Sequence, residues 1–234
     1  MLFSIFFCYF RYLESYMTQK ERYTKVLSYF KTNQPVAETE LKYNDPYQLL
    51  VAVILSAQCT DKRVNMLTPP FYDVFPTVES LSEAEFDDVF PLIKSCSYPN
   101  NKTKHLIAMA KCVCTEFSGQ IPGDVDELQK IPGVGRKTAN VIASVVFNKP
   151  ALAVDTHVFR VAARLGLTSH AKTPYEAEMQ LIKHIPTELI PISHHWLILH
   201  GRYVCKARRP ECAVCELKQF CKFYEHLATS EKEE

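Results

Sequence analysis

Apolar residues recur along most of this chain at the three-to-four-residue spacing of an amphipathic helix. In residues 156–166, Val158, Val161, Ala162 and Leu165 share one face, and Gly166 follows as a helix-ending residue. Similar helical segments are predicted at 17–30, 47–58, 82–94, 102–117, 125–130, 136–147 and 194–204. Because alternation of the kind typical of half-buried strands is scarce, the pattern predicts an all-α protein.

Polar residues that can act as N-caps precede several of these segments. Asp45 and Thr173 each stand before a proline, which favours the first position of a helix. Asp124 begins a sequence like a capping box, and Asp155 is well placed to cap the helix that follows it. Ser193 is expected to cap the helix that leads into the C-terminal cysteines.

The composition permits a large core but does not by itself indicate a partner. The chain has 234 residues, of which 47% are hydrophobic, enough for one large domain or two small ones. Its net charge is only +1, yet residues 130–166 hold six basic residues against one acid, Asp155. These bases are Lys130, Arg136, Lys137, Lys149, Arg160 and Arg164. They could form one basic face, although charge alone favours an ordinary solvated surface.

Nine cysteines indicate a reduced intracellular protein with one metal or cluster site rather than a secreted disulfide scaffold. Four of them lie close together near the C-terminus with spacings of 6, 2 and 5 residues: Cys205, Cys212, Cys215 and Cys221. The spacing is compatible both with tetrahedral zinc and with a 4Fe–4S cluster. The loop between the first two cysteines carries Lys206, Arg208 and Arg209, which it could present to a phosphate backbone.

Residues 1–16 are predicted to be an N-terminal extension outside the fold. Their apolar run ends at Arg11 after ten residues, too short to span a membrane. The segment also lacks a basic leading region and an obvious cleavage site, so a signal peptide is not expected. A weak membrane-surface anchor is the alternative interpretation.

The segment IPGVGRKTANVIASVVF, residues 131–147, joins a turn with two glycines to the start of a helix. Gly133 and Gly135 would allow backbone N–H groups to approach an anion such as a DNA phosphate. A simple packing turn between helices is the alternative, and the basic flank favours the phosphate site.

Lys137 falls in the first turn of that helix, where the partial positive charge of the helix start disfavours an ammonium group. Partial burial would strengthen the effect, and a neutral amine is a nucleophile that can form a Schiff base. A solvated surface lysine is the alternative. Asp155 could offset positive charge on a sugar while it caps its helix, or it could serve only as the cap.

Five features together resemble the endonuclease III family of helix-hairpin-helix DNA glycosylases over residues 17–225. They are LSAQCTD (55–61), IPGVGRKTANV (131–141), VDTHVFRV (154–161), HHWLILHGRYVC (194–205) and the cysteine spacing. The resemblance implies two helical domains that flank a DNA groove. A six-helix barrel with the helix-hairpin-helix motif would occupy 39–149, and 17–38 with 150–234 would form a 4Fe–4S cluster domain.

The resemblance also implies roles for individual residues. Lys137 would be the nucleophile, Asp155 the catalytic carboxylate, and Cys205, Cys212, Cys215 and Cys221 the cluster ligands. The remaining residues would contact DNA: Gln58, Tyr98, Gly133, Val134, Gly135, Arg136, Lys206, Arg208 and Arg209. Gln58 would fill the gap left by an extruded base, with Tyr98 as a second wedge. Here Ser97-Tyr98 departs from the family's commoner Gly-Leu-Tyr form, and Cys59 replaces a frequent alanine.

The function implied is that of a bifunctional enzyme which removes oxidised pyrimidines from duplex DNA and cuts the strand by β-elimination at the abasic site. The expected partner is double-stranded DNA with damaged bases or abasic sites, bound by a monomer inside the cell, in a bacterium in the nucleoid-associated cytoplasm. One alternative is the adenine glycosylase branch, which usually lacks the hairpin lysine. Another is a non-catalytic, metal-stapled DNA-binding module.

Overall fold

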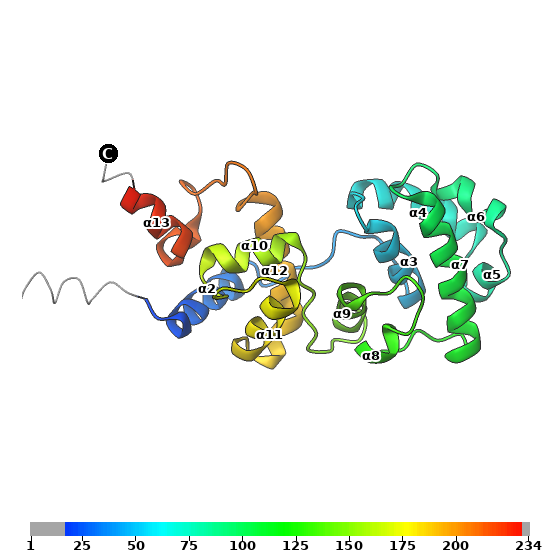
Figure 1. Ribbon diagram of the computed structural model, residues 1–234, viewed down its shortest axis with the longest axis horizontal. Coiled ribbons are helices and arrows are strands. Elements are labelled where there is room, and N and C mark those ends of the chain that lie inside the picture. The colour runs from blue at the N-terminus through cyan, green and yellow to red at the C-terminus, as the bar shows by residue number, and fades with distance from the viewer. Residues whose placement is uncertain (1–16, 231–234) are drawn as a thin grey trace, which may run out of the picture. The chain divides into compact units, whose positions relative to one another are not determined.

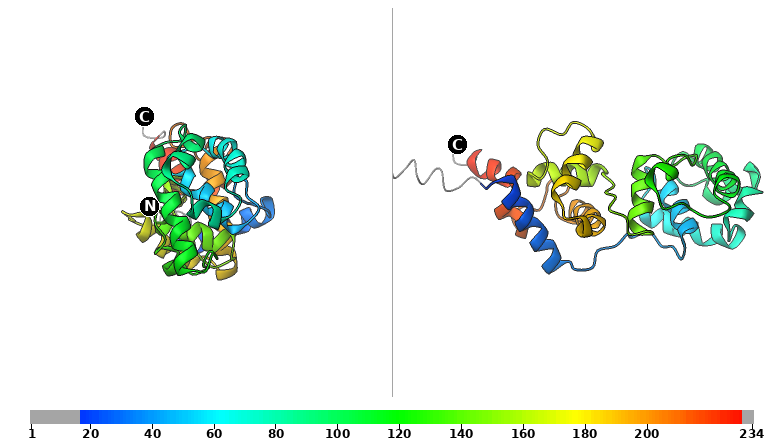
Figure 2. Two further views of the ribbon diagram at one scale, coloured as in Figure 1. Left: turned by 90° about the vertical axis from the view of Figure 1, so that its right-hand side faces the viewer. Right: turned by 90° about the horizontal axis from the view of Figure 1, so that it is seen from below.

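The computed structural model describes residues 17–230, and all regular elements in that range are helices (Figure 1, Figure 2). They are α2 (Gln19–Asn33), α3 (Pro46–Ser56), α4 (Asp61–Val74), α5 (Val78–Ser82), α6 (Phe86–Ile93), α7 (Pro99–Glu116), α8 (Val125–Leu128), α9 (Arg136–Val145), α10 (Thr156–Leu165), α11 (Pro174–His184), η1 (Thr187–Leu189), α12 (Ile190–Tyr203), η2 (Glu216–Phe220) and α13 (Lys222–Ser230). The prediction of an all-α protein is confirmed. The extension predicted for 1–16 lies outside the described residues. Within 17–230, no helix has the length and apolar character needed to cross a membrane.

The chain divides into two compact units. The hairpin unit comprises Glu38–Ala153 and Thr187–His195. Among the described residues, the cysteine unit comprises those up to Ala37, Val154–Pro186, and those from Trp196 onward. The predicted domain boundaries, 39–149 against 17–38 with 150–234, stay a prediction.

Helix α3 lies at the centre of the hairpin unit. Its side chains are apolar almost all round, and Leu49, Leu50 and Leu55 are fully buried, which is typical of a core helix. The helix begins as the sequence predicts, because Asp45 accepts a hydrogen bond from the backbone N–H of Gln48 at 2.8 Å. Helices α4, α7 and α9 pack against α3, so the helices next to Gln58, Tyr98 and the glycine turn share one core.

The cysteine unit has a separate aromatic core built on α2 and the second half of α12. The rings of Phe30 and Trp196 stack with their centroids 5.6 Å apart, and the indole N–H donates to the carbonyl of Gln34 at 2.7 Å. Arg22, also on α2 and only 4% exposed, donates to the carbonyl of Phe220 and pairs with Glu225. The first described helix is therefore held by the C-terminal segment.

Helix starts follow the predicted caps, with two exceptions. Asp61, which the sequence also offers as a cap, is instead the first residue of α4, and Thr60 before it accepts the capping hydrogen bond from the N–H of Arg63. Thr173 and Asp155 both accept hydrogen bonds from backbone N–H groups of the helices they precede. The prediction for Ser193 is wrong, because α12 begins three residues earlier, at Ile190. Proline at position 191 suits the first turn of a helix, which favours a start at Ile190. Ser193 consequently lies within the helix, and its side chain is buried.

Candidate functional site

The glycine turn connects α8 to α9 as the sequence predicts. Asp124 caps α8 by accepting from the N–H groups of Asp126 and Glu127 at 2.9 and 3.1 Å. The turn closes through a hydrogen bond from the N–H of Val134 to the carbonyl of Ile131 at 3.1 Å. Both of those side chains are buried, which fixes the turn to the core of the hairpin unit.

The two glycines of the turn meet different constraints. Gly133 has a φ of +81°, and a Cβ there would lie 2.9 Å from Cβ of His105, so the fold itself requires a glycine. Gly135 has an ordinary extended backbone, and a Cβ there would meet nothing within 4 Å. The packing of the described chain therefore does not explain Gly135, which leaves room for something outside the chain to approach its backbone.

Lys137 lies in the first turn of α9, and its side chain is exposed. The partial burial that would strengthen the effect of the helix start is therefore not present at this lysine. Helix α9 buries its other face through Ala139, Asn140 and Ile142, and the Asn140 amide donates to the carbonyl of Leu152 at 3.1 Å. Gly135, the N-cap of α9, has no side chain that could occupy the first-turn N–H groups. An accessible amine thus stands beside a helix start that favours an anion.

Asp155 caps α10 in the cysteine unit, whereas Lys137 belongs to the hairpin unit. Its Oδ1 accepts from the N–H groups of His157 and Val158 at 2.9 and 2.8 Å, so the predicted cap is confirmed. The residue is half-buried. A carboxylate that accepts two backbone hydrogen bonds is held in a fixed orientation at the start of α10.

The two predicted wedge residues stand at the tips of neighbouring loops of the hairpin unit. Gln58 follows α3, and Tyr98, 62% exposed, is the N-cap of α7. Both residues have a left-handed backbone with a φ of 54°, which is uncommon for residues other than glycine. The Ser97 hydroxyl donates to the carbonyl of Gln58 at 2.6 Å, so the loops are joined directly.

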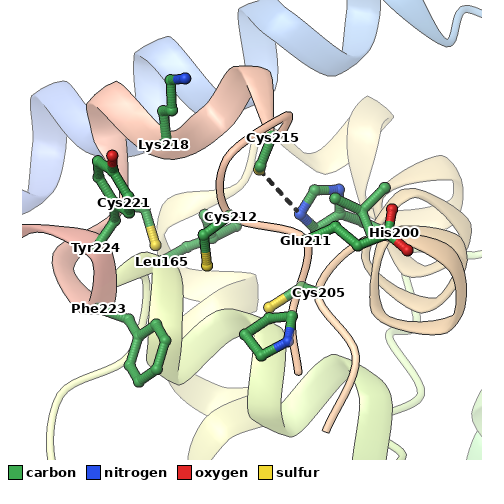
Figure 3. Close-up of a pocket in the computed structure, with 12 residues that line it drawn as sticks. Leu165, His200, Cys205, Glu211, Cys212, Cys215, Lys218, Cys221, Phe223 and Tyr224 are labelled. Atoms are coloured by element: carbon green, nitrogen blue, oxygen red, sulfur yellow. Dashed lines mark hydrogen bonds between the residues drawn. The ribbon is translucent and has the colours of Figure 1, made fainter. Parts of the chain in front are cut away.

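The four C-terminal cysteines line one pocket in the cysteine unit (Figure 3). The sulfurs of Cys205, Cys212 and Cys221 are drawn around the same space, while the sulfur of Cys215 interacts with Nε2 of His200 at 3.8 Å. Apolar side chains such as Leu165 and Phe223 complete the lining. Burial raises the pKa of the Cys212, Cys215 and Cys221 thiols. Within residues 17–230, no three His, Cys, Asp or Glu side chains are close enough together to hold a single metal ion.

Two arginines of α10 fix the loop that follows Cys205. Arg160 donates to the carbonyls of Gly201 at 2.8 Å and Cys205 at 3.1 Å. Arg164 donates to the carbonyl of Lys206 at 2.7 Å and to the sulfur of Cys205 at 3.5 Å. The guanidinium groups of both arginines thus bind the chain's own carbonyls, and the basic face suggested by the sequence stays a prediction.

The basic loop itself is exposed at Lys206, Arg208 and Arg209. Lys206 pairs with Glu211 across the loop, with Nζ and Oε1 2.5 Å apart. Its charge is thus partly neutralised by a neighbour that the sequence argument overlooked.

Comparison with known proteins connects these features to one family. The sequence profile of the HhH-GPD superfamily base excision DNA repair proteins matches residues 51–187. The chain is 44% identical to endonuclease III of Rickettsia felis over 206 residues, which is 88% of this chain and 96% of that protein. It is 39% identical to endonuclease III of Escherichia coli K12 over 208 residues, or 89% and 98% of the two chains.

The chain belongs to the endonuclease III family. Among solved structures, a trapped endonuclease III–DNA covalent intermediate matches with a TM-score of 0.85 and 39% identity, covering 91% of this chain and all of that one. The fold class predicted from sequence is thereby confirmed. As a member of the endonuclease III family, the protein is a base-excision DNA glycosylase with lyase activity.

Sequence reasoning overlooked one residue beside the wedge loops of this endonuclease III family member. Lys102 is only 5% exposed, and its amine donates to the carbonyls of Leu55 at 2.7 Å and Ala57 at 2.8 Å. In the sequence, Lys102 is one of several lysines of an amphipathic segment, and it falls on the apolar face of that segment. Because lysine is rarely buried without partners, this position is the signal that could have identified it.

Proposed function

We propose that the protein excises oxidised pyrimidines from duplex DNA and then cuts the strand through a Schiff base on Lys137. The observation that carries the proposal is the exposed Lys137 amine in the first turn of a helix whose N-cap is a glycine with open space beside its Cα. A phosphate at the helix start and a sugar beside the amine would belong to adjacent parts of one nucleotide. A solved endonuclease III–DNA covalent intermediate, from a homologue 39% identical, supports covalent chemistry here.

The damaged nucleotide is extruded from the duplex, which costs less where damage has weakened stacking and pairing. Gln58 and Tyr98, exposed at their loop tips, would fill the vacated space. The hairpin Gly133-Val134-Gly135 with Arg136 would grip the backbone through its amides and charge. Arg208 and Arg209, with Lys206 in part, would contact phosphates.

The Lys137 nitrogen then attacks C1′ of the sugar as the base leaves with the bonding electrons, and Asp155 offsets the positive charge on the sugar. The adduct opens to an imine, which acidifies the C2′ proton. Loss of that proton forms a C2′–C3′ double bond and expels the 3′ phosphate. Water hydrolyses the imine and restores the free amine.

Four thiols around one pocket are the donor set that a 4Fe–4S cluster requires, so the residues fit this group. Cys205, Cys212, Cys215 and Cys221 would hold it, and the N–H···S bond from Arg164 to Cys205 is the kind of contact that stabilises a cluster sulfur. The contribution of the cluster would be structural, because it would fix the fold of the loop that presents the basic residues. We further propose that the protein acts as a monomer inside the cell.

The first prediction concerns the nucleophile. Lys137→Ala should abolish the borohydride-trapped adduct with abasic duplex DNA, because no other amine occupies that place on α9. Asp155→Asn should slow base release by about 100-fold while DNA binding persists, since charge stabilisation acts mainly in the transition state. Trapping on denaturing gels and single-turnover base release are the measurements.

Lys149→Ala is the matched control, because Lys149 is an exposed lysine of the same unit, just beyond α9. It should trap as the unaltered protein does. Normal trapping and cleavage by Lys137→Ala would contradict the mechanism, and turnover confined to adenine opposite oxidised guanine would contradict the substrate class.

A further inference from the structure

Lys102 is a buried amine that the proposed chemistry does not use. Its two acceptors, the carbonyls of Leu55 and Ala57, lie at the end of α3, where helix carbonyls lack intrahelical partners. A cation at the carbonyl end of a helix is also favoured by the helix dipole. The Lys102 side chain therefore closes the end of α3 from a neighbouring helix.

The same residue sits in the first turn of α7. Its backbone N–H donates to the carbonyl of Tyr98, the N-cap of that helix, at 3.2 Å. The Lys102 amine donates to the carbonyl of Ala57, and the next residue in the chain is Gln58. One lysine thus contacts the backbone immediately before Gln58 with its side chain and the backbone of Tyr98 with its main chain.

A third hydrogen bond completes the connection between the two loops. Ser97 donates from its hydroxyl to the carbonyl of Gln58 at 2.6 Å. All three side-chain bonds run in one direction, from residues 97–102 to backbone carbonyls of residues 55–58. The loops that carry the two wedge side chains are consequently held as one body.

This connection acts where the backbone is strained. Gln58 and Tyr98 both adopt left-handed φ values of 54°, and neither is a glycine. Such conformations are unfavourable for ordinary side chains and persist only where the surrounding structure enforces them. Three hydrogen bonds between the loops supply that enforcement, and they keep both side chains exposed at the tips.

We propose that Lys102, assisted by Ser97, is a positioning residue that clamps the Gln58 and Tyr98 loops together and so sets both wedges for entry into the duplex. The inference rests on the proposed glycosylase function and deepens it. A prearranged wedge lowers the cost of holding the damaged nucleotide outside the helix, because no loop has to be ordered at that step.

The surroundings of Lys102 support a role that depends on its acceptors. Burial lowers the pKa of the Lys102 amine, and the thiols of Cys96 and Cys59 oppose that shift. An amine withdrawn from water needs hydrogen-bond partners within the protein, and here these are the two α3 carbonyls. Methionine in its place would keep an unbranched side chain of similar length but remove every side-chain donor.

The test uses two substrates that differ in their need for extrusion. Lys102→Met should slow single-turnover release of an oxidised pyrimidine from duplex DNA by about tenfold or more. On a single-stranded abasic oligonucleotide, where nothing has to leave a stack, strand cleavage should change by less than about threefold. Hydrogen exchange at the amides of residues 58–60 should accelerate in the same variant.

Lys104→Met is the matched control, since it removes the same charge from an exposed position on α7 and should alter neither rate. Ser97→Ala removes one bond at a half-exposed site and should give a smaller loss with the same preference for the duplex substrate. Ser97→Ala also provides the test of the proposal if Lys102→Met does not fold.

The proposal is overturned if a folded Lys102→Met, or Ser97→Ala in its place, releases the base at the unaltered rate. It is equally overturned if both substrates slow to the same extent. Failure of the proposed function would look different, because the unaltered protein would then neither release a base nor form an adduct. The exchange experiment measures the loop clamp in either case.

Discussion

At the scale of single residues, the hairpin shows how one motif can hold two glycines for different reasons. The fold requires glycine at position 133, because φ is +81° and a Cβ there would clash with His105. Nothing inside the described chain requires glycine at position 135. The exposed Lys137, two residues further on, stands at the same helix start. The motif therefore combines a glycine that the fold requires with a second glycine that the packing of the described chain does not require.

Alanine substitutions should separate these roles. Gly133→Ala should lower the free energy of unfolding by about 1–3 kcal/mol, through backbone strain and the clash with His105. Gly135→Ala should cost about 1 kcal/mol or less, as a weaker N-cap, yet it should reduce affinity for abasic duplex DNA clearly. Urea denaturation and a binding titration are the measurements. The division would be contradicted if the loss of DNA affinity simply followed the loss of stability in both variants.

At the scale of elements, the sequence predicts helices and their starts better than it predicts side-chain roles. Asp45 and Asp155 were predicted as caps because capping is a local interaction between a side chain and the next turn. Ser193 failed because nearby residues offered an earlier start, so two local signals competed. The roles of Lys102, Arg160 and Arg164 depend on carbonyls 40 or more positions away in the chain. No local pattern reports such contacts.

The cysteine pocket gives the prediction that belongs to this scale. Purified protein should be brown and hold about four iron atoms per chain, as one 4Fe–4S cluster requires. Cys212→Ser should lose the colour and iron and melt at a lower temperature, because a bound group stabilises only the folded state.

Cys114→Ser, which alters a half-buried cysteine on α7 far along the chain from the pocket, should keep both colour and iron. A colourless protein with one zinc per chain would contradict the cluster assignment.

At the scale of the whole molecule, a net charge of +1 hides how the charge is distributed. Some of the basic residues counted along the sequence serve the chain itself: Arg160 and Arg164 bind carbonyls, and Lys206 pairs with Glu211. The cations left for DNA are consequently fewer than the sequence indicates. Affinity should therefore depend on salt less steeply than a count of bases would suggest.

The ion pair across the basic loop makes that expectation testable. Glu211→Gln should free Lys206 for a phosphate and steepen the plot of log affinity against log salt by about 0.9, the increment for one phosphate contact. Lys206→Gln should leave the slope unchanged or slightly shallower. Binding to undamaged duplex across a salt series measures both. Identical slopes for Glu211→Gln and the unaltered protein would show that Lys206 does not reach DNA.

The hydrogen bond from Arg22 on α2 to the carbonyl of Phe220 has a consequence for biosynthesis. Helix α2 is translated before the hairpin unit, whereas Phe220, which binds it, is translated after that unit. The hairpin unit, continuous from Glu38 to Ala153 apart from one short return segment, can collapse while α2 still waits with its aromatic face uncovered. The cysteine unit therefore cannot be completed until the residues around Phe220 have been translated, and loading of iron and sulfide would follow that point.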